Sequence, residues 1–207
     1  MITKPNTEHF HTEVFIENLE GCLNQTPALF LCISEKEEEV LRLVLGDCLY
    51  IEFKDQFELT ATGYSLKEDV DEKWKWLLNG RTYEYDGFKP YPCGCGCVSS
   101  NCKKMEYPGM VKKTDLTLTK SFEKNYLAYY IYYNWKTINE TVTAGTGEQV
   151  PEVKNSTTVY NKKKRYNAWN RFVDWVHELN AFLAHHKTEF PDAKPICSIQ
   201  RLNIYDI

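Results

Sequence analysis

The sequence has no long apolar run. None of its hydrophobic segments approaches the roughly 20 residues that a membrane-spanning helix needs, so we expect no insertion into a membrane. Residues 1–9 contain no apolar stretch of the kind that a signal peptide carries. These two absences predict a cytoplasmic protein, in which structural disulfides are not expected.

A strong charge of one sign is also missing. The 207 residues include 25 Lys and Arg and 29 Asp and Glu, which gives a formal net charge of −4. Such a chain has no overall attraction to nucleic acid or to an acidic membrane. Binding of that kind would need a local basic patch.

Apolar and aromatic residues are plentiful, at 43% and 14% of the chain. This composition favours a packed globule, and we expect residues 1–207 to form a single domain whose core is large enough to be stable without disulfide cross-links. The 14 tyrosines and five tryptophans combine a large contact area with a polar atom. Side chains of this type suit half-buried sheets and interfaces equally well.

Helical spacing and helix-start patterns predict three helices. Ser34 begins a Ser-x-x-Glu capping box ahead of a helix at 35–45, and Ser65 begins a second box ahead of a helix that Gly80 would end. The longest predicted helix runs from about 163 to 187. Its apolar stripe consists of Trp169, Phe172, Val173, Val176, Leu179, Phe182 and Leu183.

The other patterned segments predict strands. We expect strands at 13–17, 28–33, 48–53, 57–62, 81–86, 114–119, 125–142, 157–160 and 196–204, and a loop at 143–156. Residues 40–45 could also form a strand, and 48–53 with 57–62 would form a hairpin. Strands in runs, with the helices segregated, predict an α+β fold. It would have a mostly antiparallel sheet, one long C-terminal amphipathic helix and one or two shorter helices.

The strongest local signal is a cysteine-rich loop inserted at about 87–109. Half of the eight cysteines fall within ten residues of this Pro- and Gly-rich segment. The four are Cys93, Cys95, Cys97 and Cys102. Zinc takes four tetrahedral nitrogen or sulfur ligands, and thiolates on a Gly-rich turn can wrap around it. We expect structural zinc here, with free or disulfide-bonded cysteines and a redox or iron–sulfur role as the alternatives.

The run Cys95-Gly-Cys97-Val-Ser-Ser-Asn-Cys102-Lys103 resembles the Cys-x-Cys-x4-Cys knuckle that follows SET methyltransferase domains. In that family, a fourth cysteine from the catalytic domain completes a zinc site. The resemblance covers about nine residues, and the chain has no Asn-His-Ser-Cys motif. It therefore implies zinc binding alone, with Cys93, another cysteine or a histidine as the fourth ligand.

A second pattern resembles the two halves of a zinc-dependent nucleoside or base deaminase site. These halves are His11-Thr-Glu13 and Pro-Cys93-x3-Cys97. In that family, one His and two Cys hold zinc and the Glu carries the proton. The gap between the halves is much longer here than in the family. An ordinary exposed His-Glu pair is therefore the alternative interpretation.

A basic run precedes two aromatic residues, Tyr166 and Trp169, at the start of the predicted long helix. The run consists of Lys162, Lys163, Lys164 and Arg165. Cations interleaved with aromatic rings can bind phosphates and stack on bases. A solvated first helical turn is the alternative, although cations at a helix N-terminus are electrostatically unfavourable.

Two histidine patterns on the same helix predict structural roles. His177-Glu178 resembles the start of a zincin motif, but Ala181 stands where the second His ligand would be. His185 and His186 end the helix, where a cation is favourable.

No complete catalytic set of residues emerges from these patterns. We therefore expect a non-enzymatic, zinc-stabilised protein that docks on another protein, in the manner of an inhibitor or an immunity protein. One alternative is a nucleic-acid-binding module that uses residues 162–169. The other is a deaminase-like zinc hydrolase.

Overall fold

A computed structural model describes residues 9–10, 12–16, 25–60, 63–84, 104–117, 120–138, 142–144, 147–149, 162–194, 196 and 198–203. Its helices are η2 (Thr12–Val14, a 3-10 helix), α1 (Gln25–Leu45), α2 (Asp47–Lys54), α3 (Glu72–Asn79), α4 (Leu127–Ile138) and α5 (Lys162–His185). Its strands are β1 (Phe57–Thr60), β2 (Gly63–Leu66), β3 (Arg81–Glu84), β4 (Lys104–Tyr107), β5 (Val111–Thr117), β6 (Lys120–Asn125), β7 (Val142–Ala144) and β8 (Gly147–Gln149). Among the helices described, none is long and apolar enough to cross a membrane.

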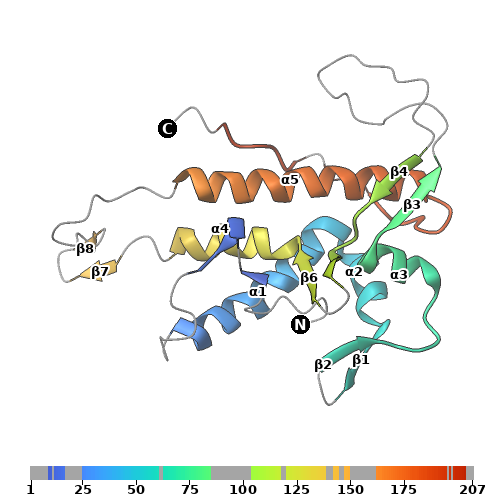
Figure 1. Cartoon of the computed structure of the whole chain (residues 1–207), viewed down its shortest axis with the longest axis horizontal. Coiled ribbons are helices and arrows are strands. Elements are labelled where there is room, and N and C mark those ends of the chain that lie inside the picture. Colours follow the sequence, from blue (N-terminus) through green and yellow to red (C-terminus); the bar gives the residue numbers. More distant parts are fainter. Residues whose placement is uncertain are drawn as a thin grey trace.

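The α+β class and the long C-terminal helix are confirmed. Helix α5 spans 162–185, close to the predicted 163–187. Instead of one main sheet, the described strands form four separate antiparallel pairs: β1 with β2, β3 with β4, β5 with β6, and β7 with β8. Helix α4 lies between α5 and α1, as Figure 1 shows, and this helical stack holds most of the core.

Helix α4 occupies much of the segment 125–142 that was predicted to be a strand. Seven of its 12 residues are buried, because α5 covers one side and α1 another. Its first six residues, 127–132, are all buried, so no polar residue interrupts this apolar run. Its aromatic and β-branched residues then favour a strand prediction. The missed signal is Asn125, whose Oδ1 accepts the Leu127 N–H at 2.9 Å and caps the helix start.

Two further strand predictions were wrong near the N-terminal end. Residues 28–33 belong to α1, so Ser34 lies inside a helix and caps nothing. Residues 48–53 belong to α2, and β1 pairs with β2 rather than with them. Gly46, with φ 76°, separates α1 from α2, and a positive φ at the end of a helix suits glycine. Short apolar runs of this length fit a buried helix as well as a strand.

The predictions for residues 65–107 are confirmed in part. Helix α3 ends at Gly80 as expected, but it begins after Asp71, and Ser65 lies in β2. Strand β3 confirms the start of the strand predicted at 81–86. Its partner β4 lies within the segment 87–109 that was predicted to be irregular.

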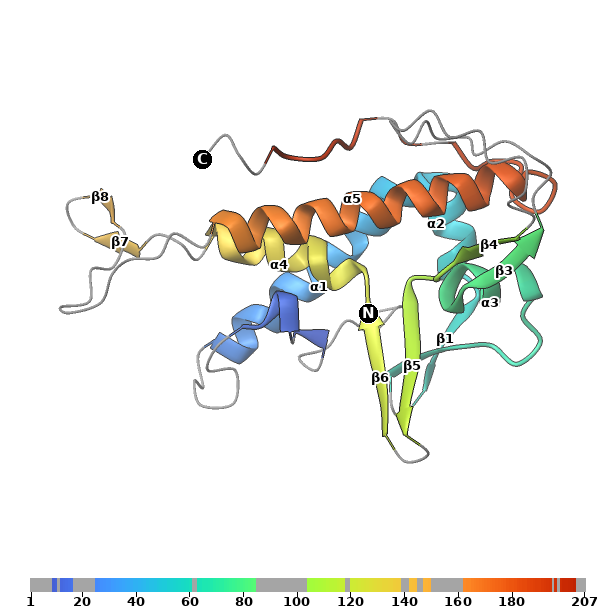
Figure 2. The ribbon, with the colours of Figure 1, turned by 45° about the horizontal axis from the view of Figure 1, so that its top comes forward.

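The chain ends also differ from expectation. A strand was predicted at 13–17, but residues 12–14 form η2 and residues 15–16 have no regular secondary structure. Residues 198–203 form no strand and run along the outside of α5, as Figures 1 and 2 show. Strands β7 and β8 lie in the segment predicted to be a loop. The strand predicted at 157–160 lies outside the described residues.

A close backbone contact between Gly80 and Gly109 joins α3 to the β4–β5 turn, and this turn is bonded to α5. The φ angles are +87° and +81°, and a Cβ on either residue would overlap the backbone of the other segment. Trp175 of α5 donates from its indole Nε1 to the Gly109 carbonyl at 2.8 Å. The Tyr107 hydroxyl donates to the Leu77 carbonyl at 3.1 Å. Both aromatic side chains are almost fully buried, so the first bond fixes the β4–β5 turn onto α5 and the second fixes β4 onto α3.

Replacing Gly109 by Ala should destabilise the protein by about 2–4 kcal/mol, because left-handed strain adds to a backbone overlap. Gly46→Ala is the matched control, since its φ is also positive but no atom lies within 4 Å of the added Cβ. We expect about 1 kcal/mol for this control. Urea unfolding of both variants measures the difference. Equal losses of stability would show that the Gly80–Gly109 contact is not tight.

Candidate functional site

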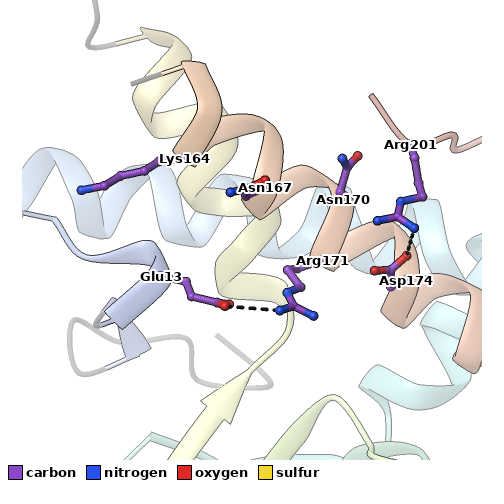
Figure 3. A pocket seen from close by; sticks show the side chains of 7 residues that line it. All are labelled: Glu13, Lys164, Asn167, Asn170, Arg171, Asp174 and Arg201. Atoms are coloured by element: carbon purple, nitrogen blue, oxygen red, sulfur yellow. Dashed lines mark hydrogen bonds and ion pairs between the residues drawn. The ribbon is translucent and has the colours of Figure 1, made fainter. Parts of the chain in front are cut away.

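A polar groove of about 480 Å³ lies on the outer face of α5, towards its N-terminal half. Figure 3 shows its lining, which comes from three parts of the chain. The lining residues are Glu13 of η2, Arg201 of the C-terminal segment, and Lys164, Asn167, Asn170, Arg171 and Asp174 of α5. Each of the five α5 residues is three or four positions from another of them, which places them on one helix face.

Two long ion pairs span the groove. The Arg171 Nη2 lies 3.5 Å from the Glu13 Oε1, with side chains that are 58% and 50% exposed. The Arg201 Nη1 lies 3.6 Å from the Asp174 Oδ1, with side chains that are 61% and 39% exposed. Exposed pairs at such distances contribute little to stability, typically about 0–1 kcal/mol. The two pairs therefore orient these four side chains but do not hold them rigidly.

Glu13 has a second, firmer partner. The Tyr129 hydroxyl of α4 donates to the Glu13 Oε2 at 3.0 Å. Burial raises the pKa of Tyr129, and the nearby Glu13 charge raises it further, so the hydroxyl remains a donor at neutral pH. This bond ties the N-terminal segment to the helical core. It gives Glu13 a structural role that does not depend on any metal.

The C-terminal segment is held along α5 by side-chain amides. Asn170 Nδ2 donates to the Leu202 carbonyl at 2.9 Å, and its Oδ1 accepts the Leu202 N–H at 2.7 Å. Asn180 makes the same pair of bonds to Ile196, at 3.0 and 3.1 Å. Each amide replaces a strand partner, so the backbone is satisfied without a sheet. The clasp at Asn170 positions Arg201 at the groove.

The predicted basic and aromatic segment begins α5, and only Lys164 of it lines the groove. The Arg165 guanidinium lies 5.8 Å from the Tyr133 ring centroid and 5.7 Å from that of Tyr166. Trp169 donates from its indole Nε1 to the Gln200 carbonyl at 2.8 Å and packs on Tyr133. The side chains of Lys162 and Lys163 do not line the groove. The larger residues of this segment are thus engaged in the fold.

The four predicted zinc ligands, Cys93, Cys95, Cys97 and Cys102, lie outside the described residues. Strands β3 and β4 flank that segment, and their pairing brings Glu84 opposite Lys104. Among the described residues, no group of three or more His, Cys, Asp or Glu could hold a metal ion.

The C-terminal end of α5 lies beside this strand pair. The Tyr83 ring centroid is 4.9 Å from that of His185 and 5.1 Å from that of His186. The ring of His186 is buried, and burial lowers its pKa, so the imidazole is neutral at neutral pH. Its Nδ1 lies 3.1 Å from the Phe182 carbonyl. His185 and His186 therefore contribute to packing, as the sequence predicted.

Apart from Glu13 and Lys164, none of the described sequence candidates lines this groove. His11, a ligand in the deaminase-like alternative, lies outside the described residues. His177 and Glu178 lie on α5 beyond the groove, and burial raises the pKa of Glu178, with the Asp174 charge adding to the rise.

Comparisons with protein-family models, with curated proteins and with solved structures found no match to this chain. The groove is therefore interpreted from its own geometry. Sequence reasoning missed most of its residues, although the polar positions of α5 opposite its apolar stripe held a signal for Asn167, Arg171 and Asp174. Nothing in the sequence pointed to Arg201.

Replacing Asn170 by Ala should lower stability by about 1–3 kcal/mol, because the N–H and the carbonyl of Leu202, which are partly buried, both lose their partner. Asn167→Ala is the matched control on the same helix face. Its side chain is exposed, so we expect a change within about 0.5 kcal/mol. Chemical denaturation gives the free energies, and hydrogen exchange at Leu202 should accelerate only in the first variant. Unchanged exchange there would contradict the clasp.

Proposed function

We propose that this protein acts by docking on another protein, without catalysing a reaction, in the manner of an inhibitor or an immunity protein. The observation that carries the proposal is the lining of the groove on α5. Every side chain that lines it is charged or carries an amide. Sites for small substrates are lined mainly by apolar and aromatic side chains, with few polar groups. An open groove with no apolar or aromatic side chain in its lining suits a protein contact better than catalysis.

The mixed signs of charge in the groove support a protein partner over a nucleic acid. The cations are Lys164, Arg171 and Arg201, and the carboxylates are Glu13 and Asp174. Complementary charges across a protein interface steer association and fix its register. A phosphate backbone would instead bring repeated negative charges against the two carboxylates. The alternative nucleic-acid module on 162–169 is further weakened because Arg165 and Trp169 already contact other parts of the fold.

An exposed aromatic side chain follows the groove residue Glu13 closely in the chain. Phe15 is 55% exposed, although Phe is among the residue types most often buried in folded proteins. Aromatic and arginine side chains are the residues that most often dominate binding energy at protein interfaces. In this proposal, Phe15 and Arg171 are the two anchors of the docking surface.

Zinc held by Cys93, Cys95, Cys97 and Cys102 remains part of the proposal. Support comes from the β3–β4 pairing, because a segment whose two ends are already held together loses less entropy when it wraps around an ion. The thiolates must stay reduced for this role, which fits a cytoplasmic location. The zinc would then stabilise the fold and take no part in chemistry.

Purified protein should contain about one zinc per chain, and Cys97→Ser or Cys102→Ser should remove it. Because structural zinc contributes folding free energy, we expect the Tm of either variant to fall by more than about 5 °C. Cys48→Ser is the control, since Cys48 is a free, exposed cysteine on α2. Elemental analysis and calorimetry make the two measurements. Four cysteines in disulfides, or metal-free protein of unchanged Tm, would contradict the zinc site.

The docking proposal is tested by filling the groove. Asn167→Trp adds bulk at an exposed groove position without changing charge, and Lys75→Trp adds the same bulk on the exposed face of α3. A protein captured by the wild type from its native cells is first purified, and its affinity for each variant is then measured by calorimetry. We expect Asn167→Trp to weaken binding at least about tenfold, as loss of a central contact does. Lys75→Trp should bind normally.

Three results would contradict docking at the groove. One is equal binding by both Trp variants, and another is the absence of any captured protein that binds again after purification. The third is ammonia release from cytidine or adenosine that Glu13→Ala abolishes, which would establish the deaminase-like alternative.

A further inference from the structure

The α5 side of the groove presents two side chains that have no partner among the described residues. Within this part of the chain, the Lys164 ammonium and the Asn167 amide make no hydrogen bond or ion pair, and both line the groove. Figure 3 shows them on successive turns of α5, with Arg171 on the next turn. Three donor side chains at spacings of three and four residues share one helix face. Of these three, Arg171 alone has an acceptor in the described part of the fold, which is Glu13.

Arg171 can change partner without leaving a carboxylate unpaired. Its pair with Glu13 is long, at 3.5 Å, and both side chains are at least half exposed. Glu13 keeps the Tyr129 hydroxyl at 3.0 Å when the guanidinium turns away. A guanidinium presents a planar fork of donors that matches both oxygens of a carboxylate. The present pair therefore holds Arg171 at the groove and leaves part of its fork free.

The charge in the groove matches a single negative group. Three cations and two carboxylates line it, which leaves an excess of one positive charge. One incoming carboxylate would neutralise that excess. A second or third negative charge would meet Glu13 and Asp174, and like charges at contact distance are unfavourable. The groove thus favours an isolated acidic side chain over a polyanion.

We infer that Lys164, Asn167 and Arg171 form a carboxylate-binding site that receives an Asp or Glu side chain of the docked protein. This inference rests on the proposed docking function and names the chemistry of the partner. The Arg171 fork binds both carboxylate oxygens, Asn167 donates one amide hydrogen bond, and Lys164 supplies the balancing charge. Arg201 at the other end of the groove adds positive potential.

The test uses the full-length protein and short peptides. The probe is acetyl-Ala-Glu-Ala-amide, and its neutral counterpart is acetyl-Ala-Gln-Ala-amide. In 15N NMR titrations, the Glu peptide should shift the Asn167 side-chain amide and the Arg171 Nε–H saturably, while the Gln peptide should not. Arg171→Gln should weaken this binding about tenfold, as loss of a charge-assisted hydrogen bond does. Lys75→Gln, the control for loss of one exposed cation, should leave it unchanged.

Inorganic phosphate and a short single-stranded DNA complete the titrations. Binding of either at these residues more tightly than the Glu peptide at near-physiological salt would overturn the carboxylate assignment in favour of phosphate. Equal shifts with the Gln peptide, or shifts that survive Arg171→Gln, would overturn it as well.

The Trp variants separate this inference from the docking function. If the partner binds and Asn167→Trp weakens its binding, but the Glu peptide does not bind, then only the carboxylate assignment is contradicted. If the Glu peptide binds but no captured protein does, then only the docking function is contradicted.

Discussion

Helix α5 is buried against the core along one face and bound to the C-terminal segment along another. The positions of the β4–β5 turn, the C-terminal segment and the groove all depend on these two sets of contacts. The apolar stripe of α5 packs on α4, and Trp175 reaches the β4–β5 turn through the Gly109 carbonyl. On the outer side, Asn170 and Asn180 bind the backbone of the C-terminal segment. A helix fixed on both sides can hold charged side chains in place with little rearrangement. The groove is built on this rigid support.

The sequence predicts the elements whose pattern reflects one buried face. Helix α5 has a clear apolar stripe, and α3 ends at Gly80 where the positive φ suits glycine. Helix α4 escapes prediction because α1 and α5 bury its first six residues without a polar break, and its aromatic residues favour a strand. The C-terminal segment escapes because its backbone bonds go to Asn170 and Asn180 rather than to a strand. Side-chain clasps of this kind leave no period in the sequence.

In the candidate site, too, some residues can be predicted from the sequence and others cannot. Lys164 was found from the sequence because it belongs to a basic run, although the fold uses it differently from Arg165, which lies near two tyrosine rings. Arg201 meets Asp174 only because the C-terminal segment returns along α5, and no local pattern predicts such a long-range contact. Strands β3 and β4, which flank the cysteine-rich segment in the chain, lie near the other end of α5, as Figure 1 shows. In our proposal, the zinc site and the docking groove therefore have separate roles.

The central claim is that the outer face of α5 is the docking surface. Hydrogen exchange with and without the purified partner tests it most directly. The account predicts slower exchange on binding in residues 164–174 and 198–203, because the partner covers both walls of the groove. Slowing confined to the β3–β4 pair, with α5 and the C-terminal segment unchanged, would contradict it.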